Sequence, residues 1–180
     1  MLRGLRSDFQ LFHRTYHRHR SRRMALAAFW LQPSTEALLL MRMASTGPKV
    51  ISLIARRRLL RRFSTDVERG ASIAPGLLVA HALGIVLGGG TRTAHNVKLH
   101  HNVTLGVDRG GWPTLEEDVM VFPGAVVVGP VTIGRGANIG ANAFVSADVP
   151  AGTVVPGGTR WTRTVAAAQD PPGSLRRREA

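Results

Sequence analysis

Small or aliphatic residues recur at every sixth position through residues 71–156. The repeat runs through six positions, is interrupted once, and continues through seven more. The two groups are Ile73, Val79, Ile85, Thr91, Val97 and Val103, then Val119, Ala125, Val131, Ala137, Ala143, Val149 and Val155. A period of six built from aliphatic, glycine and small residues is typical of a parallel β-helix made of hexapeptides.

Each hexapeptide of such a helix supplies one short strand and one turn, and three of them close a coil of about 18 residues. One aliphatic side chain per hexapeptide points inward, so stability comes from stacked neighbouring coils. A Gly-rich β-sandwich is the alternative, but it would show a period of two and irregular turn spacing. We therefore predict a left-handed parallel β-helix over residues 65–161.

The residues before the repeats have a helical composition. Apolar segments at 38–43 and 50–55 are separated by Gly47 and Pro48, and Pro33 is typical of a helix start. The longest apolar run, residues 24–31, is too short to span a bilayer. We predict an α-helical extension over residues 1–64 that caps the repeats, and a disordered polar tail over residues 162–180.

Positive charge is concentrated in the extension. Residues 1–70 carry 15 Lys and Arg against 4 Asp and Glu, whereas residues 71–180 carry 9 against 7. Aromatic residues make up only 6% of the chain, so stacking on nucleic acid is poorly supported and no nucleic-acid partner is expected. The favoured interpretation is a cap with a solvated basic face. The alternative is contact between basic helices and an anionic membrane surface.

Two further interpretations concern location. The first 23 residues are Arg-rich, as transit peptides are, but Asp8 interrupts them and no cleavage pattern follows. The chain has no cysteine, which excludes a disulfide framework and a thiol nucleophile. That composition fits a reducing compartment, and we expect a cytoplasmic protein.

His81 is the first candidate for chemistry. It shares its repeat position with Leu99, three hexapeptides later, and the same position elsewhere holds Leu115 and Ile133. A histidine there breaks the local pattern, as functional residues often do. Asp66 precedes His81 by close to one coil, so we expect it under His81 and within hydrogen-bond reach. A carboxylate there would orient the imidazole of a general base.

The interrupted repeat is the second candidate. The interval from Val103 to Val119 is not a multiple of six, so residues 106–113 must leave the stack as a loop. With Leu99 one coil above His81, we expect His100, His101 and this loop to gather at one edge. The predicted substrate contacts are His101, Asp108, Arg109 and Trp112. An internal Asp108–Arg109 ion pair is the simpler interpretation of those two charges, and Trp112 is either a substrate platform or an anchor for the loop.

A metal site is not expected. His95, His100 and His101 are close in sequence, but adjacent residues on a strand point to opposite faces. The basic, His-containing segment at 13–19 is interpreted as part of the extension.

Four short strings resemble the serine acetyltransferase family of hexapeptide acyltransferases. They are residues 66–71, DVERGA; residues 81–86, HALGIV; residues 102–106, NVTLG; and residues 113–115, PTL. The likeness extends from Asp66 to Trp161, with a weaker continuation upstream at Gln32-Pro33 and residues 39–44.

The resemblance implies a homotrimer, with acetyl-CoA as co-substrate in the groove between neighbouring β-helices and the active site between subunits. It implies direct attack of a small-molecule hydroxyl on the thioester, with His81 as general base and Asp66 as its orienting partner. Coil turns supply oxyanion donors. The predicted coenzyme A contacts are Gly124, Ala125, Gly140, Ala141, Gly157 and Arg160, the last to a phosphate.

The chain departs from the family on the acceptor side. Serine-specific members usually have Asp before the base and His before the loop proline, where this chain has Ala80 and Trp112. The family string Gly-x-Pro-Ala reads Gly157-Gly158-Thr159-Arg160. The main hypothesis is therefore an O-acetyltransferase resembling serine O-acetyltransferase. The alternatives are a sugar, polysaccharide or secondary-metabolite acceptor, a non-catalytic hexapeptide scaffold, and a binder of membrane or nucleic acid through the basic extension.

Overall fold

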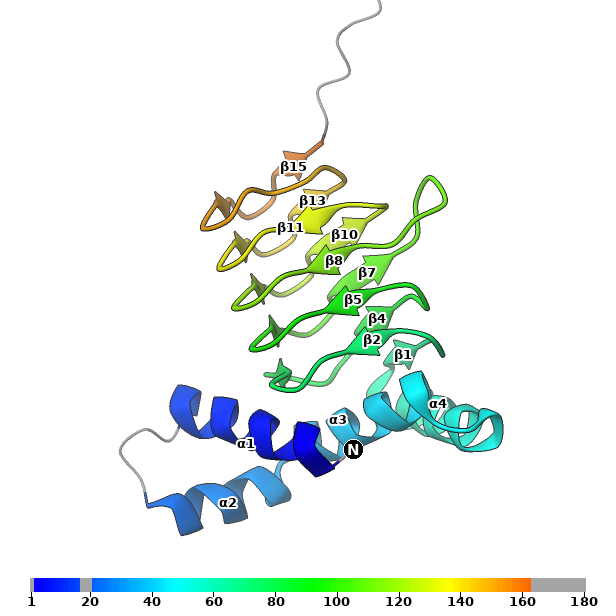
Figure 1. The fold of residues 1–180 in the computed structure, drawn as a ribbon, viewed down its shortest axis with the longest axis vertical. Helices are drawn as coiled ribbons and strands as arrows, with labels where there is room; N and C mark the ends of the chain where they lie inside the picture. The colour runs from blue at the N-terminus through cyan, green and yellow to red at the C-terminus, as the bar shows by residue number, and fades with distance from the viewer. Residues whose placement is uncertain (1, 17–20, 163–180) are drawn as a thin grey trace, which may run out of the picture.

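The structure is a computed structural model that describes residues 2–16 and 21–162. Within them, helices gather beneath a stack of short strands (Figure 1). The helices are α1 Leu2–Tyr16, α2 Arg22–Leu31, α3 Pro33–Thr46 and α4 Lys49–Phe63. The strands are β1 Asp66–Val67, β2 Ser72–Ile73, β3 Leu78–Val79, β4 Val86–Leu87, β5 Arg92–Thr93, β6 Lys98–Leu99, β7 Thr104–Gly106, β8 Thr114–Leu115, β9 Met120–Val121, β10 Val126–Val128, β11 Thr132–Ile133, β12 Asn138–Ile139, β13 Phe144–Val145, β14 Val154–Val155 and β15 Arg160–Trp161.

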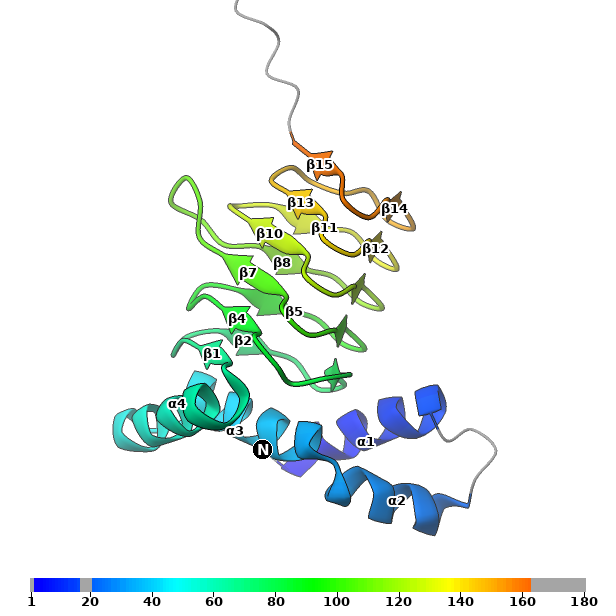
Figure 2. The ribbon, with the colours of Figure 1, turned by 180° about the vertical axis from the view of Figure 1, so that it is seen from behind.

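The strands form three parallel sheets that are the sides of a solenoid (Figure 2). Side A has the order β1-β4-β7-β10-β13-β15, side B has β2-β5-β8-β11, and side C has β3-β6-β9-β12-β14. Consecutive strands belong to different sides, and each strand pairs with a strand of the next coil. This arrangement confirms the predicted left-handed parallel β-helix.

The coils are not of equal length, and the uniform six-residue register is wrong at both ends. Val79 pairs with Leu99, two residues beyond a regular coil, whereas Ile139 pairs with Val155, two residues short of one. In the middle of the stack, β8 and β11 pair in the regular register of three hexapeptides. Side chains two residues apart on a strand face the same way, so a shift of two residues keeps an aliphatic residue inside. The six-residue pattern in the sequence therefore stays the same even where the strand pairing shifts by two residues.

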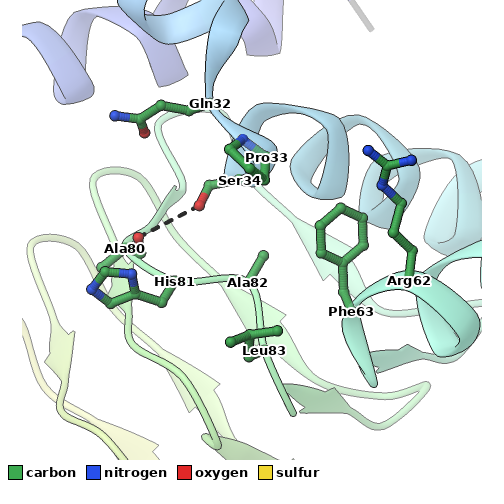
Figure 3. Close-up of a pocket in the computed structure, with 9 residues that line it drawn as sticks. All are labelled: Gln32, Pro33, Ser34, Arg62, Phe63, Ala80, His81, Ala82 and Leu83. Carbon is green, nitrogen blue, oxygen red and sulfur yellow. Dashed lines mark hydrogen bonds between the residues drawn. The ribbon is translucent and has the colours of Figure 1, made fainter.

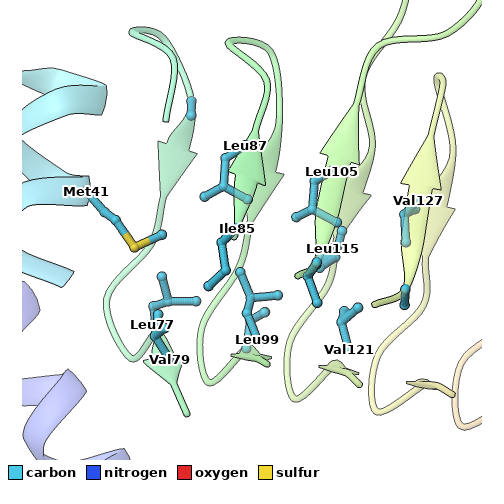
Figure 4. Close-up of a cluster of buried hydrophobic side chains, with 14 of the residues drawn as sticks. Met41, Leu77, Val79, Ile85, Leu87, Leu99, Leu105, Leu115, Val121 and Val127 are labelled. Carbon is cyan, nitrogen blue, oxygen red and sulfur yellow. The ribbon is translucent and has the colours of Figure 1, made fainter. Parts of the chain in front are cut away.

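The helices close the open first coil, which confirms the predicted cap. Met41 of α3 is fully buried and belongs to the same apolar cluster as Leu77 and Ile85 of the solenoid (Figure 4). Leu59 of α4 is fully buried in that cluster as well. A smaller cluster joins α1 and α2 to β3 through Leu11, Phe12, Phe29 and Leu78. Uncapped, the first coil would expose its apolar interior to water.

A buried ion pair fixes the cap on the first coil. Asp8 of α1 is fully buried and accepts hydrogen bonds from Arg42 of α3, at 2.8 Å and 3.1 Å. It also accepts from the backbone N–H groups of Gly76 and Leu77, at 2.8 Å and 2.9 Å. Burial raises the pKa of Asp8, and Arg42 and the two N–H groups oppose that rise. This polar network joins two helices to one turn of the solenoid.

The helix boundaries follow the sequence signals. α3 begins at Pro33, and Gly47 and Pro48 separate it from α4. No single helix in the described ranges is long and apolar enough to cross a membrane. Taken together, α2 and α3 have the length and composition of a span, but they are bent by 68° where they meet. Apart from Thr162, the tail predicted to be disordered lies outside the described residues.

Candidate functional site

His81 lies at the corner between sides C and A, after β3 and before β4. Its side chain is exposed, and the corner is two residues longer than a regular one, as the pairing of Val79 with Leu99 shows. The prediction that His81 takes the place of an inward aliphatic residue is therefore wrong. Leu99 lies above Val79, and Leu115 and Ile133 belong to side B. His81 projects from a corner, where a reactive side chain is accessible.

His101 is the residue one coil above His81. The two rings meet edge to face, with centroids 5.8 Å apart. The neighbouring His100 instead stacks on Phe122, with centroids 5.3 Å apart and ring planes within 5°. Burial lowers the pKa of His100, and charge on His101 and His81 lowers it further. The cluster therefore disfavours imidazolium at His100, a neighbour of the candidate base.

A pocket of about 530 Å³ opens beside His81, between the solenoid and the cap (Figure 3). Its lining comes from the turn between α2 and α3, the end of α4 and the His81 corner. The lining residues are Gln32, Pro33, Ser34, Arg62, Phe63, Ala80, His81, Ala82 and Leu83. Ser34 donates a hydrogen bond of 3.5 Å from its hydroxyl to the carbonyl oxygen of Ala80. The pocket has one guanidinium and no carboxylate among these residues.

Asp66 makes its hydrogen bonds to Arg56, and the hydrogen bond expected between Asp66 and His81 is not formed within this chain. Both of its carboxylate oxygens accept from Arg56 of α4, at 2.5 Å and 2.8 Å. The sequence interval from Asp66 to His81 is close to a coil, but the first coil is longer, and it places Val86 of side A above Asp66. Asp66 therefore joins the cap to the first strand.

The loop predicted at 106–113 does leave the stack, but at a different corner from His81. It connects β7 of side A to β8 of side B, whereas His81 and His101 lie between sides C and A. The expectation that the loop and the histidines share an edge is therefore wrong within one chain. Asp108 and Gly111 exchange backbone hydrogen bonds across a tight turn. Asp108 and Arg109 form an exposed ion pair of 3.6 Å, as the simpler interpretation predicted.

Trp112 acts as an anchor for this loop. Its indole lies against Gly88 and Gly90, at the same A–B corner one coil below, and a Cβ added at Gly90 would overlap the ring. Glycines at these positions leave room for a flat aromatic surface. The packing supports the interpretation of Trp112 as an anchor for the loop, and its contact with a substrate stays a prediction. The Trp112 end of the loop packs against the coil below, and the Arg109 end projects into solvent.

Most of the predicted coenzyme A contacts lie on the same corner line as His81. Gly124 follows β9, Gly140 and Ala141 follow β12, and Gly157 follows β14, all between sides C and A. Within the described part of the chain, the N–H groups of Ala141 and Gly157 donate to no acceptor. A line of glycine corners with unused donors suits a long polar ligand lying along the edge.

The other two predicted contacts differ in whether they can reach a ligand. Ala125 is fully buried, its N–H donates to Phe122 and its carbonyl accepts from Thr104, so the prediction that it contacts coenzyme A is wrong for this chain. Arg160 lies on side A, with its guanidinium 4.6 Å from the centroid of the Phe144 ring. That contact positions an exposed cation near the last corner.

The histidines do not form a metal site in the part of the chain described here. No group of three or more His, Cys, Asp or Glu side chains there is arranged to hold an ion. His95 lies away from the cluster, with its Nδ1 3.1 Å from the carbonyl oxygen of Pro75.

Sequence comparison places this chain in a family. A family profile described as bacterial transferase hexapeptide (six repeats) matches residues 113–147. The serine acetyltransferase of Helicobacter pylori is 38% identical over 143 residues, which cover 74% of this chain and 83% of that protein. The chain belongs to the serine acetyltransferase family. The serine acetyltransferase of Buchnera aphidicola from Acyrthosiphon pisum is 36% identical over 118 residues, but these cover only 43% of it.

Solved serine acetyltransferases have the same fold. The Neisseria gonorrhoeae enzyme in complex with serine aligns with a TM-score of 0.74 at 26% identity, covering 84% of this chain and 64% of that one. The Brucella abortus enzyme in complex with coenzyme A aligns with a TM-score of 0.76 at 25% identity, covering 86% and 64%. The chain thus spans just under two thirds of these serine acetyltransferases. The predicted family is confirmed.

The sequence missed the contribution of the cap to the pocket. Gln32, Ser34, Arg62 and Phe63 line it, yet they come from helix ends that are distant in sequence from His81. The Gln32-Pro33 pair in the upstream resemblance was the one signal that pointed to this turn. Which helix end meets which corner depends on how the cap packs on the first coil.

Proposed function

We propose that this chain is an acetyl-CoA-dependent O-acetyltransferase, with L-serine as the first acceptor to test and His81 as general base. The observation that carries the proposal is the position of His81. It lines the pocket beside the cap, and it lies on the same edge of the solenoid as the glycine corners between sides C and A. Relatives named serine acetyltransferase support the acyl-transfer chemistry. The neighbour solved with coenzyme A supports acetyl-CoA as the co-substrate.

The residues of the edge fit such a co-substrate. When bound, acetyl-CoA supplies a thioester to be attacked. The unused N–H groups of Ala141 and Gly157 are available to donate to the carbonyl oxygens of a pantetheine arm. Side chains are absent at Gly124, Gly140 and Gly157, which allows close approach to the backbone. Arg160 is exposed near the last corner and would suit a phosphate.

His81 would move the proton. A neutral imidazole nitrogen takes the proton of the acceptor hydroxyl as its oxygen forms the new ester bond. The same nitrogen returns the proton to the departing sulfur, so free thiol is the product and the histidine is neutral again. General acid–base help of this kind contributes about 10²–10⁴ in rate. His101, in edge-to-face contact, is a group that would position the ring.

The proposed assembly is a homotrimer with the active site between subunits. The loop carrying Asp108 and Arg109 lies at the A–B corner, so it reaches an acceptor near His81 only if a second copy brings it there. A heterologous three-fold contact pairs different surfaces of neighbouring subunits and closes into a ring. The separation of the two corners supports a shared site.

The decisive assay is thiol release from acetyl-CoA with L-serine as acceptor. We expect serine to accelerate release by wild type, and His81→Ala to lose about 10²–10⁴ of kcat. The matched control is His95→Ala, which removes a histidine outside the cluster and should retain activity. If acetyl-CoA fails to bind the wild type, the chain is a non-catalytic scaffold. If His81→Ala keeps the wild-type rate, the base is another group.

A second acceptor class is supported by the pocket itself. Its lining has no carboxylate to receive an α-ammonium group, and Ala80 stands directly before His81. Its guanidinium, on Arg62, is paired with Glu36 at 3.1 Å. A sugar, polysaccharide or secondary-metabolite hydroxyl would need no such carboxylate. The same assay decides between the classes: bound acetyl-CoA, no response to serine and a response to saccharides would favour the second.

A further inference from the structure

The outer face of α4 is both apolar and cationic. The helix buries one stripe against the solenoid and α3, made of Ser52, Ala55, Leu59 and Phe63. The opposite stripe, which we call the α4 outer stripe, consists of Val50, Leu53, Ile54, Arg57 and Arg61 at spacings of three and four residues.

The apolar half of the outer stripe is open to solvent. Val50 is 69% exposed, Leu53 52% and Ile54 61%. Three neighbouring aliphatic side chains on one helix face, which no element of the described ranges covers, form a candidate interaction site. Their partner must therefore offer an apolar layer.

The other half of the stripe requires an anion. Within the described residues, Arg57 and Arg61 have no carboxylate partner, because the acidic groups nearby are already paired. Those pairs are Asp8–Arg42, Glu36–Arg58, Glu36–Arg62 and Asp66–Arg56. Residues 1–70 carry an excess of 11 basic over acidic side chains. The partner must therefore be anionic as well as apolar.

α2 offers a second patch of the same chemistry. Trp30 is 55% exposed and Leu31 84%, and Arg22 and Arg23 are exposed at the start of the helix. Figures 1 and 2 show α2 and α4 at opposite ends of the helical layer, with the solenoid on one side of both. Trp30 and the two arginines lie at opposite ends of α2, and tryptophan and arginine on one amphipathic helix are typical of the interface between lipid and water.

We propose that the cap docks on an anionic membrane surface through the α4 outer stripe, with α2 as a second contact. A helix lying in the interface buries its aliphatic residues at the headgroup boundary, while arginines bind anionic headgroups. A second cap is a poorer occupant, because it would bring a like charge of the same size. Surface contact rather than insertion follows from the burial of α3, whose Met41 and Ala44 lie in the solenoid core.

The test is co-sedimentation of the full chain with vesicles. We expect binding to phosphatidylglycerol–phosphatidylcholine vesicles, little binding to pure phosphatidylcholine, and weaker binding as salt rises. Arg57→Gln with Arg61→Gln should weaken binding about 25-fold, since each cation near the surface is worth about fivefold. Val50→Ser with Ile54→Ser should weaken it at least about tenfold at unchanged charge.

Matched controls come from exposed positions on the solenoid. Arg92→Gln removes an exposed cation, and Val154→Ser removes an aliphatic side chain that is 65% exposed. Both should bind within about twofold of wild type. Equal binding to neutral vesicles, or no binding to anionic ones, would overturn the proposal. The proposal would also be overturned if the Arg57→Gln, Arg61→Gln variant lost vesicle binding and the Val50→Ser, Ile54→Ser variant did not. That result would indicate a polyanion as the partner. Self-association that the serine pair abolishes, without vesicle binding, would assign the stripe to a second copy.

Discussion

Arg56 holds Asp66 through both carboxylate oxygens, and this pair decides what Asp66 does in the folded chain. Arg56 also lies 3.8 Å from Glu68, so one guanidinium faces two carboxylates of the first coil. The hydrogen bonds that Arg56 donates to Asp66 raise the pKa of Arg56, and the charges of Asp66 and Glu68 add to that rise. The pair joins α4 of the cap to β1, the first strand of side A.

We predict that Arg56→Met and Asp66→Asn destabilise the fold through the same interaction. Because the pair is bidentate but partly exposed, each variant should lower the free energy of unfolding by about 0.5–1 kcal/mol. The double variant should lose less than the sum of the two single variants. Urea unfolding of the four proteins measures this coupling. Additive losses, with a shifted pH–rate profile for Asp66→Asn alone, would assign Asp66 to His81 instead.

At the scale of the element, the loop after β7 is fixed by what lies beneath it. The Gly88–Gly90 turn gives Trp112 a surface without side chains, and the Asp108–Gly111 turn extends beyond that anchor. Because Trp112 anchors one end of the loop, the turn at the other end would hold Arg109 away from the coil. The order of the loop thus depends on two glycines in the preceding coil, Gly88 and Gly90.

Gly90→Ala should therefore displace Trp112 and destabilise the loop. The added methyl group would overlap the indole, and such overpacking costs about 1–3 kcal/mol. Gly106→Ala is the control, since its Cβ would make only an ordinary contact of 3.4 Å with Val128. In a Trp112→Ala background, Gly90→Ala should cost little. Thermal unfolding of these variants tests the contact, and equal losses for Gly90→Ala in both backgrounds would contradict it.

The elements also show why the sequence predicted the solenoid but not its register. Each hexapeptide has two inward side chains, such as Val103 and Leu105, two residues apart on one strand face. When a corner is two residues longer, as in the first coil, or two residues shorter, as in the last, a residue moves from one of the two inward positions of its strand to the other. Both positions are aliphatic, so the six-residue pattern does not change. The fold was therefore predictable, whereas the residue above His81 was not. His81 itself was found because its family strings are local in sequence.

At the scale of the molecule, the helical cap forms part of the pocket beside His81 as well as closing the solenoid. It closes the first coil through Met41 and Leu59, and it lines the pocket through Ser34, Arg62 and Phe63. Removal of the cap would expose the first coil and open the pocket at once. These contacts join segments far apart in sequence, which is why residue patterns alone did not reveal them.

The separation of the two corners gives the proposed shared site a direct test in mixed assemblies. His81→Ala removes the base from one chain, and Arg109→Ala with Trp112→Ala disables the loop of another. Each variant alone should lose most of its thiol-release activity. When the two are co-expressed with different affinity tags and purified through both tags, some sites combine an intact base with an intact loop. Random assortment of equal amounts in a ring gives about one such site in four before selection.

Recovered activity in the doubly purified material would require the base and the loop to come from different chains. The recovery has a physical cause in the fold, because a rigid solenoid cannot bring its A–B corner to its own C–A corner. Co-expression of the His81→Ala chain with a second, differently tagged His81→Ala chain is the matched control and should stay inactive. If the mixed assemblies are as inactive as this control, each site is complete within one chain. The loop then acts on its own solenoid, and the two corners have separate functions.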